Sequence, residues 1–162
     1  MTARTTSHAT FSITRHYRQA PATVFDAWAD EKSKTAWFAA PPPRETVKRS
    51  FDFRVGGREQ LSTDFGDGKV HHFDAVYRDI VPAARILYAY DMYINEARIS
   101  VSLATIDLQP DGAGTRLVFT EQAVFLDGFD DDGGRRRGSE YLIDNLTAFL
   151  QRSEGQKEEM QP

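Results

Sequence analysis

A glutamate interrupts the apolar face of a predicted strand late in the chain. Read at every second residue from Leu117, the segment GTRLVFTEQAVFLDGF places Glu121 between Phe119 and Ala123 on its more aromatic face. Burying an ionised carboxylate without a partner is costly, so a cation, a proton, water or a ligand must accompany it. Glu121 is therefore the first candidate for a catalytic acid or base, or for a group that orients a ligand. The alternative is an ion pair that stabilises the fold and touches no ligand.

The adjacent histidines of VHHFDAVYRDIV form the second candidate group. His71 and His72 are consecutive in a predicted strand, so they point to opposite faces and are poorly placed to bind one metal ion. His71 shares a face with Phe73 and Tyr77, where it can line a cavity as an acid or base, or simply as a hydrogen-bonded wall residue. The other two histidines are isolated in the sequence, and we predict no metal site.

Sequence motifs that define a particular reaction are absent. There is no GxSxG nucleophile segment, no HExxH pair and no glycine-rich loop that opens a helix, as a phosphate site requires. The glycines in GDG, PDGAG and VGG instead match hairpin turns and bulges. The sequence therefore leaves enzymatic activity undecided and favours a binding role, and we expect no cofactor.

The composition excludes several classes of partner. Lysines plus arginines number 20 and aspartates plus glutamates number 24, so the net charge of −4 gives no general attraction to nucleic acid or anionic lipid. The absence of cysteine excludes disulfides and thiolate sites. No apolar run is long enough for a membrane span, and the N-terminal MTARTTSHAT lacks the hydrophobic core of a signal peptide. We expect a cytoplasmic protein with no nucleic-acid partner and no membrane insertion.

The first part of the chain is predicted to form a strand and two short helices. FSITRHYR alternates as a half-buried strand does, with Arg15 as the charged member of its apolar face. Pro21 suits the first turn of the helix PATVFDAWAD, and Asp30 fits the N-cap of a second helix, EKSKTAWF. That helix ends at Trp37 and Phe38, just before AAPPP, where the two rings either gate a cavity or cap the core.

From Arg44 to Phe125 nearly every segment has strand character and is punctuated by glycine and aspartate turns, which predicts a long antiparallel meander. Two of its strands predict an apolar wall, formed by Tyr88, Tyr90 and Met92 on one and by Ile99, Val101 and Leu103 on the next.

The last part of the chain changes to helical periodicity. Its apolar stripe consists of Leu142, Leu146, Phe149 and Leu150, with Tyr141 and Asn145 beside it. Three arginines, Arg135–Arg137, lie near the predicted start of this helix, where positive charge opposes the macrodipole. The adjacent Asp130–Asp132 can compensate, so we interpret the run as a solvated face, with an anion site as the less favoured alternative.

These elements fit one domain that spans residues 11–152, with a frayed N-terminus at 1–10 and a disordered polar tail at 153–162. The economical way to bury both apolar surfaces is to lay the long helix across a curved antiparallel sheet. Because a helix is narrower than such a sheet, we expect a cavity between them.

The chain resembles the helix-grip START/SRPBCC superfamily in the order of its elements. Three segments add to the resemblance: the WF after the first helices, the DIVP before a tyrosine-rich strand, and GTRLVFTEQAVFLDGF before the last helix. The likeness runs from Phe11 to Leu150 and is to the branch named for the activator of the heat-shock-protein-90 ATPase, with its bacterial single-domain, polyketide-cyclase-like relatives. It implies an α+β fold in which a curved antiparallel sheet of six or seven strands wraps around a long C-terminal α-helix, with two short helices after the first strand. It also implies that the first and last strands are neighbours, so we hypothesise a direct ion pair between Arg15 and Glu121.

The expected function is the binding of a small, largely apolar molecule, aromatic or lipid-like, in the cavity between sheet and helix. The predicted ligand-binding residues are Trp37, Phe73, Tyr90, Met92, Val101, Phe119, Glu121, Tyr141 and Asn145. One alternative is a cyclase, dehydratase or hydrolase in which Glu121 or His71 moves a proton. A second alternative, implied only by the branch name, is an interaction protein of the chaperone ATPase. The oligomeric state is left open, with a homodimer among the alternatives.

Overall fold

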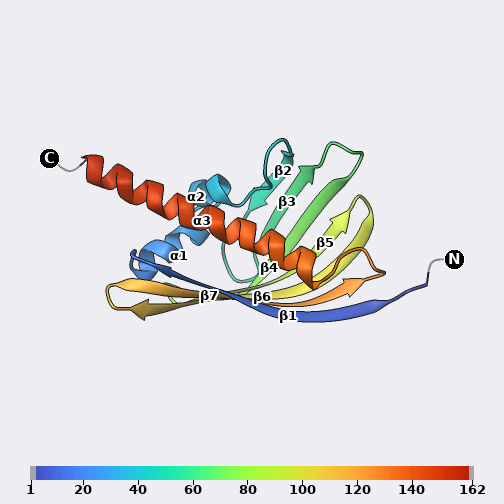
Figure 1. Cartoon of the computed structure of the whole chain (residues 1–162), viewed down its shortest axis with the longest axis horizontal. Helices are drawn as coiled ribbons and strands as arrows, with labels where there is room; N and C mark the ends of the chain where they lie inside the picture. The colour runs from blue at the N-terminus through green and yellow to red at the C-terminus, as the bar shows by residue number, and fades with distance from the viewer. Residues whose placement is uncertain (1–2, 161–162) are drawn as a thin grey trace.

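The computed structural model describes residues 3–160 and, toward the C-terminus, side chains up to residue 156. Within these residues the elements follow in the order β1 (Thr6–Tyr17), α1 (Pro21–Ala29), α2 (Glu31–Trp37), β2 (Glu45–Phe51), β3 (Arg58–Asp64), β4 (Val70–Val81), β5 (Arg85–Ile94), β6 (Ala97–Asp111), β7 (Gly114–Leu126) and α3 (Asp132–Met160). Figure 1 shows α3 crossing in front of a curved sheet, with α1 and α2 beside it.

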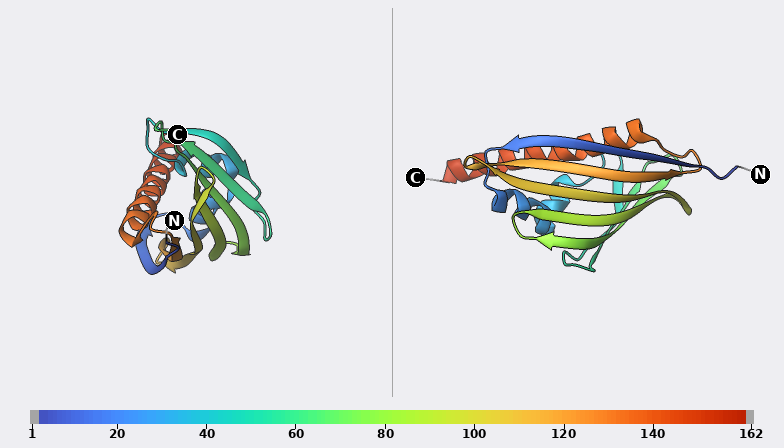
Figure 2. Two further views of the ribbon diagram at one scale, coloured as in Figure 1. Left: turned by 90° about the vertical axis from the view of Figure 1, so that its right-hand side faces the viewer. Right: turned by 90° about the horizontal axis from the view of Figure 1, so that it is seen from below.

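The described strands form one seven-stranded sheet in the order β1-β7-β6-β5-β4-β3-β2. All neighbouring pairs are antiparallel, and from β2 to β7 each strand pairs with the next in the sequence. β1 pairs with β7 from Thr6 opposite Leu126 to Tyr17 opposite Thr115, which confirms that the first and last strands are neighbours. Figure 2 shows the sheet curling around α3. The predicted helix-grip α+β fold is confirmed.

The two short helices form as their capping residues predict. Pro21 is the first residue of α1, and the Asp30 carboxylate accepts a hydrogen bond from the Ser33 backbone N–H at 2.9 Å, which caps α2. The indole Nε1 of Trp37 donates to the Ala27 carbonyl oxygen at 2.9 Å. Trp37 is only 1% exposed and packs edge to face on Trp28, with ring centroids 4.7 Å apart. The corner between α1 and α2 is therefore a rigid part of the core.

The apolar stripe of α3 packs on the concave side of the sheet. Leu146 and Leu150 are buried as predicted, together with Ile143, while Leu142 and Phe149 are partly buried against the same core. Each fully buried side chain of this size stabilises the fold by about 1.5–3 kcal/mol. In the described part of the chain, no helix combines the length and hydrophobicity needed to cross a bilayer.

A bulge in β6 overturns the predicted apolar wall on that strand. Met92 of β5 pairs with Ser100, but the next residue, Tyr93, pairs with Arg98, so Ile99 has no partner. The extra residue moves the side chains that follow it to the other face of the sheet. Val101 therefore points outward with 39% exposure, while Ser100 and Ser102 point to the interior and are buried.

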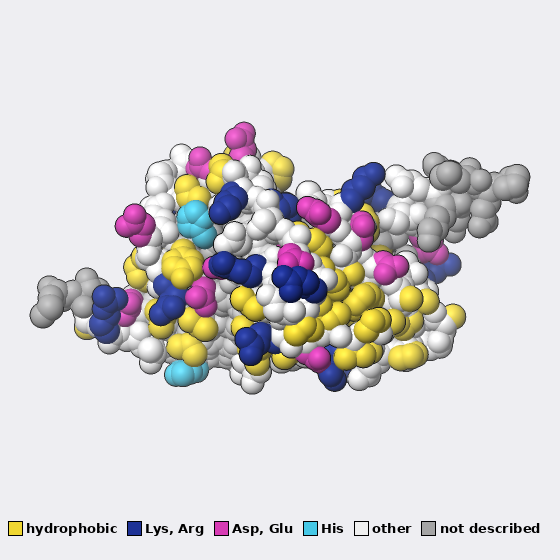
Figure 3. Space-filling model, turned by 180° about the vertical axis from the view of Figure 1, so that it is seen from behind, with side chains coloured by type: hydrophobic (Ala, Val, Ile, Leu, Met, Phe, Trp, Pro, Cys, Tyr) yellow, Lys and Arg dark blue, Asp and Glu magenta, His cyan; other side chains and the backbone are white. Residues whose placement is uncertain are grey.

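The outer side of the sheet is also partly apolar. Seen from behind (Figure 3), hydrophobic side chains gather on this surface among charged side chains of both signs. Leu87, Leu103 and Val118 alternate with the inward-facing residues of β5, β6 and β7 and are partly buried. The sheet is therefore not strictly apolar inside and polar outside, which is why alternation alone did not assign every face.

The ends of the domain differ from the sequence expectation. Residues 6–10 were expected to be frayed, but they form the start of β1 because their backbone pairs with Gln122 to Leu126 of β7. The polar segment from residue 153 was expected to be disordered, but α3 continues through it to Met160. The side-chain amide of Gln19 contacts α3 where this segment begins: it donates to the Leu150 carbonyl at 3.1 Å and to the Glu154 carboxylate at 2.9 Å. Residues 1–2 and 161–162, which belong to the same predictions, lie outside the described residues.

A buried ion pair joins α2 to β3, and sequence reasoning did not find it. Lys34 Nζ lies 2.9 Å from Glu59 Oε1, and the side chains of both residues are only 2% exposed. The ring of Phe38 lies 4.4 Å from Nζ, with the rings of Trp28, Trp37 and Phe51 further out. Glu59 also accepts a hydrogen bond from the Tyr77 hydroxyl. This pair compensates two charges that would otherwise be costly inside the core.

Candidate functional site

A cavity of about 250 Å³ lies between the concave face of the sheet and α3. This volume is just below the range of about 300–1,000 Å³ that is usual for small-molecule sites. Most of the wall is aromatic or aliphatic, and its larger side chains include Trp28, Trp37, Phe73, Tyr88, Met92 and Phe119. The cavity thus has the surface chemistry of a site for a small apolar molecule.

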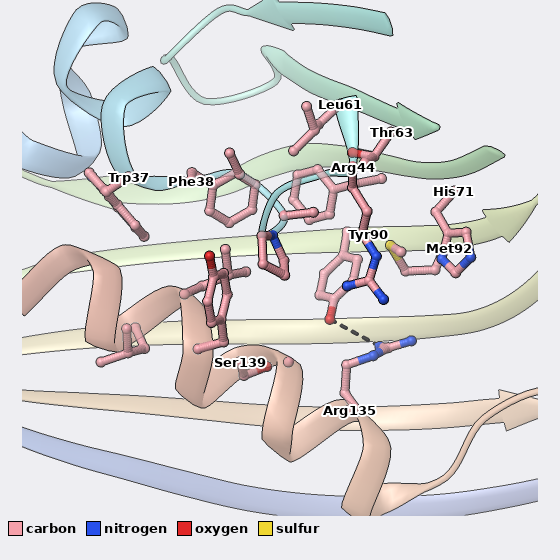
Figure 4. A pocket seen from close by; sticks show the side chains of 18 of the residues that line it. Trp37, Phe38, Arg44, Leu61, Thr63, His71, Tyr90, Met92, Arg135 and Ser139 are labelled. Carbon is pink, nitrogen blue, oxygen red and sulfur yellow. Dashed lines mark hydrogen bonds between the residues drawn. The ribbon is translucent and has the colours of Figure 1, made fainter. Parts of the chain in front are cut away.

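The two arginines and the histidine of the wall lie toward one end of the cavity (Figure 4). In Figure 4, Trp37 and Phe38 mark one end, while His71 and Met92 mark the other. Arg44 and Arg135 approach the His71 end from opposite sides, one from the loop before β2 and the other from α3. The cavity therefore offers an apolar end and a charged end to one ligand.

Glu121 is fully buried, with 0% exposure, and each of its carboxylate oxygens accepts hydrogen bonds from protein side chains. The Tyr90 hydroxyl donates to Oε1 at 2.7 Å, and the Ser102 hydroxyl donates to Oε2 at 3.0 Å. The cation is Arg135, whose Nη1 lies 3.0 Å from Oε2. Burial and then the adjacent charge of Glu121 raise the pKa of Tyr90, so its hydroxyl stays protonated and remains a donor.

Arg135 uses its terminal nitrogens to join α3 to the floor of the cavity. Besides Glu121, Nη1 donates to the Tyr90 hydroxyl at 3.0 Å and to the Ser102 hydroxyl at 3.1 Å. Nη2 donates to the Ser100 hydroxyl at 2.6 Å and lies 3.5 Å from Asp130. The two inward-facing serines that the bulge creates are therefore the ones that satisfy this guanidinium.

The hypothesised ion pair between Arg15 and Glu121 is wrong. On β1 the residue opposite Glu121 is Phe11, while Arg15 lies opposite Leu117. Four residues along a strand correspond to about 13 Å, beyond the reach of a direct pair. Arg15 instead lies 3.2 Å from Asp144 of α3, in a pair whose side chains are 34% and 65% exposed.

Sequence reasoning overlooked Arg135 because it lies in the run Arg135–Arg137, which was interpreted as a solvated face. A usable signal was present, since extending the apolar stripe of the helix backward from Leu142 by two turns leads to Arg135. Arg135 is 8% exposed, whereas Arg137 is exposed. The neighbouring Asp130 does contribute compensation, as predicted, through its contact with Nη2.

His71 faces the cavity, as its strand position predicts, and its ring stacks on Phe65 with centroids 3.6 Å apart and planes 2° apart. Burial is the main reason that the pKa of His71 is lowered, so the ring is neutral near pH 7. His72 faces the other side of the sheet, where its Nδ1 lies 2.6 Å from the Ser62 hydroxyl. Among the described residues, no group of three or more histidine, aspartate or glutamate side chains is arranged to hold a metal ion.

Most of the predicted ligand-binding residues lie in the cavity wall. Those that line it are Trp37, Phe73, Tyr90, Met92, Phe119, Glu121 and Tyr141. Val101 does not, because the bulge turns it outward. Asn145 does not either, because its side-chain amide donates to the Trp37 carbonyl at 3.2 Å and links α3 to α2. Arg44, Arg135 and Ser139 line the cavity and were missing from the prediction.

Together, the fold and the cavity define a helix-grip domain in which a long helix closes over a curved antiparallel sheet. The family model described as "Activator of Hsp90 ATPase homolog 1-like protein" matches residues 18–151, and the chain belongs to this family. The resemblance inferred from the sequence is thereby confirmed.

Solved structures of bacterial proteins have the same architecture. A protein from Rhizobium leguminosarum is 46% identical, with a TM-score of 0.88, 93% of this chain covered and 99% of that one. The Mll3558 protein from Rhizobium loti is 41% identical, with a TM-score of 0.83 and coverage of 90% and 99%. An AHSA1-like protein from Aeromonas hydrophila is 18% identical, with a TM-score of 0.64 and coverage of 90% and 94%, and shares the fold. No curated protein matches the sequence significantly.

Proposed function

We propose that this protein binds a small, largely apolar molecule, aromatic or lipid-like, in the cavity between the sheet and α3. The observation that carries the proposal is the cavity of about 250 Å³ whose wall combines aromatic rings with a few polar groups held in place. A ligand that buries about 200 Å² of apolar surface gains about 5 kcal/mol before the costs of association. Apolar contact thus supplies the affinity, and the polar groups orient the ligand.

The geometry favours binding without catalysis. A general acid or base must exchange a proton with the ligand, and Glu121 is committed to Arg135, Tyr90 and Ser102. To act as a base it would have to break a buried ion pair, which is costly. The network serves better as a rigid floor for the cavity. The family name refers to a chaperone ATPase, but the cavity supports the binding of a small molecule rather than that interaction.

Two measurements test the proposal. Native mass spectrometry of freshly purified protein should reveal a co-purifying small molecule, and titration with the neutral fluorophore N-phenyl-1-naphthylamine should give saturable binding of one molecule per chain. Absence of both would overturn the proposal.

A matched pair of variants locates the binding. Ser139 lines the cavity from α3, so Ser139→Phe fills it, whereas Val101→Phe adds a ring of the same size on the outer face of the sheet. We expect Ser139→Phe to weaken fluorophore binding at least tenfold and Val101→Phe to leave it unchanged. Circular dichroism checks that both variants are folded. Equal binding by the wild type and Ser139→Phe would place the fluorophore elsewhere.

A further inference from the structure

We infer that the ligand carries an anionic group, such as a carboxylate, and that Arg44 holds this group at the charged end of the cavity. The inference rests on the proposed function, because it specifies the chemistry of the molecule in the same cavity.

One charged side chain of the cavity wall has no ionic partner among the described residues. Four titratable side chains other than tyrosine line it: Arg44, His71, Glu121 and Arg135. Arg135 and Glu121 neutralise each other at 3.0 Å, with Asp130 at 3.5 Å on the far side of the guanidinium. His71 is neutral near pH 7 because burial lowers its pKa. Arg44 is therefore the charged side chain of the wall that no carboxylate of the described residues contacts.

Arg44 is an exposed cation whose side-chain donors are not committed to protein acceptors. Within the part of the chain that the structure describes, its side chain forms no ion pair and no hydrogen bond, although a guanidinium carries five N–H donors. The second arginine of the lining, Arg135, differs because protein acceptors occupy both of its terminal nitrogens. An anion that enters the cavity therefore competes with water, and not with a protein acceptor, for the donors of Arg44.

Stacking holds Arg44 in position without consuming those donors. Its guanidinium carbon lies 4.1 Å from the centroid of the Phe65 ring. The imidazole of His71 stacks on the same ring, with the two ring centroids 3.6 Å apart. Because the stacked imidazole fills one face of the Phe65 ring, the guanidinium of Arg44 lies over the opposite face. A stacked guanidinium keeps its N–H edge free to bind a carboxylate through two parallel hydrogen bonds. Phe65 therefore preorganises Arg44 for an anion.

The direction of the Arg44 side chain places that edge at the cavity. It begins in the exposed loop before β2 and points toward Tyr90 and the Arg135 side of the wall (Figure 4). The opposite end is closed by the buried rings of Trp28 and Trp37. An aromatic acid of one or two rings, with the carboxylate at Arg44 and the rings toward Trp37, matches both ends.

The test compares two aromatic molecules of nearly the same shape, one anionic and one neutral. Isothermal titration calorimetry at pH 7.5 in low salt measures the affinities of 1-naphthaleneacetate and of its neutral amide, 1-naphthaleneacetamide. We expect the acid to bind the wild type about tenfold more tightly, which is the effect of one charge-assisted hydrogen-bonded contact. In Arg44→Gln the two affinities should become equal, because the amide affinity stays and the advantage of the acid is lost. Arg44→Lys should retain part of the advantage.

A control variant separates direct contact from long-range charge. Arg116 is an exposed residue of β7 whose side chain bonds Gln109, so Arg116→Gln changes the net charge by the same amount away from the cavity. It should keep the tenfold preference. If the wild type binds acid and amide equally, or if Arg44→Gln keeps the preference, the inference is overturned and the proposed function stands. If neither molecule binds the wild type, the proposed function fails for aromatic ligands of this size and the inference fails with it.

Discussion

Glu121 of β7 and Arg135 of α3 form a buried ion pair in which Oε2 and Nη1 lie 3.0 Å apart. Tyr90 of β5 and the serines 100 and 102 of β6 complete the hydrogen bonding of these two side chains. One guanidinium thus connects the first turn of α3 to three adjacent strands. The distance between helix and sheet at the charged end of the cavity depends on this contact, so the pair shapes the cavity even if the ligand never touches it.

Replacing Glu121 by glutamine should be strongly destabilising. The substitution keeps the shape of the side chain but leaves the buried charge of Arg135 with one counter-ion, Asp130, which lies 3.5 Å from Nη2 and is partly exposed. Breaking one partner of a buried pair costs about 3–5 kcal/mol. We expect a loss of this size in the free energy of unfolding, measured by urea denaturation at pH 7.

The Arg15–Asp144 pair supplies the control for that measurement. Its side chains are 34% and 65% exposed, and exposed pairs contribute about 0–1 kcal/mol. Arg15→Gln should therefore have a small effect. The double variant Glu121→Gln with Arg135→Met should recover part of the loss, since no buried charge is then left unpaired. Equal costs for Glu121→Gln and Arg15→Gln would show that the buried pair is not stabilising.

Replacing Lys34 by methionine tests the second buried pair. Methionine fits among the surrounding rings, but it leaves the Glu59 carboxylate buried with only the Tyr77 hydroxyl as a donor. We expect a loss of about 3–5 kcal/mol in the free energy of unfolding. The double variant Lys34→Met with Glu59→Gln should be more stable than the single variant. If the two single losses simply add, the residues are not energetically coupled.

The fold was predictable from the sequence because each of its signals is local. Alternation defined the strands, Asp30 and Pro21 defined the short helices, and the stripe around Leu146 defined the face that α3 buries. The bulge at Ile99 was not predictable, because it appears only in the pairing of β5 with β6. One unpaired residue reversed the faces of Val101 and Ser102, and with them part of the predicted site.

The partner of Glu121 was not predictable for a related reason. Neighbouring strands do not define which residues stand opposite each other, and the register of β1 on β7 places Arg15 too far along the strand. Arg135 lies 14 positions away in the sequence and reaches Glu121 only because α3 folds back over the sheet. Cavity residues that lie on alternating strand positions, such as Tyr90 and Met92, were predicted, whereas the loop residue Arg44 had no periodic signal.

Two glycines should respond oppositely to substitution by alanine. A Cβ on Gly114, at the start of β7, would clash with the Tyr17 carbonyl oxygen, so the backbones of β1 and β7 would have to separate. Gly155 in α3 has no atom within 4 Å of the same position. We expect Gly114→Ala to lower the melting temperature, while Gly155→Ala raises the stability by about 0.5–1 kcal/mol through helix propensity. A neutral Gly114→Ala would contradict the close strand contact.

Acidification should weaken the fold partly through His71. Burial is the largest cause that lowers the pKa of His71, Arg44 and Lys69 lower it further, and Asp67 and Asp130 oppose them. Because the folded pKa lies below the unfolded value of about 6.5, the unfolded state binds more protons as the pH falls through this range, and stability is lost. The measurement is the free energy of unfolding of the wild type and of His71→Gln at pH 7.5, 6.5 and 5.5. As the pH is lowered, the wild type should lose more stability than the variant. A difference that is constant or grows on acidification would mean that His71 is not held neutral by burial.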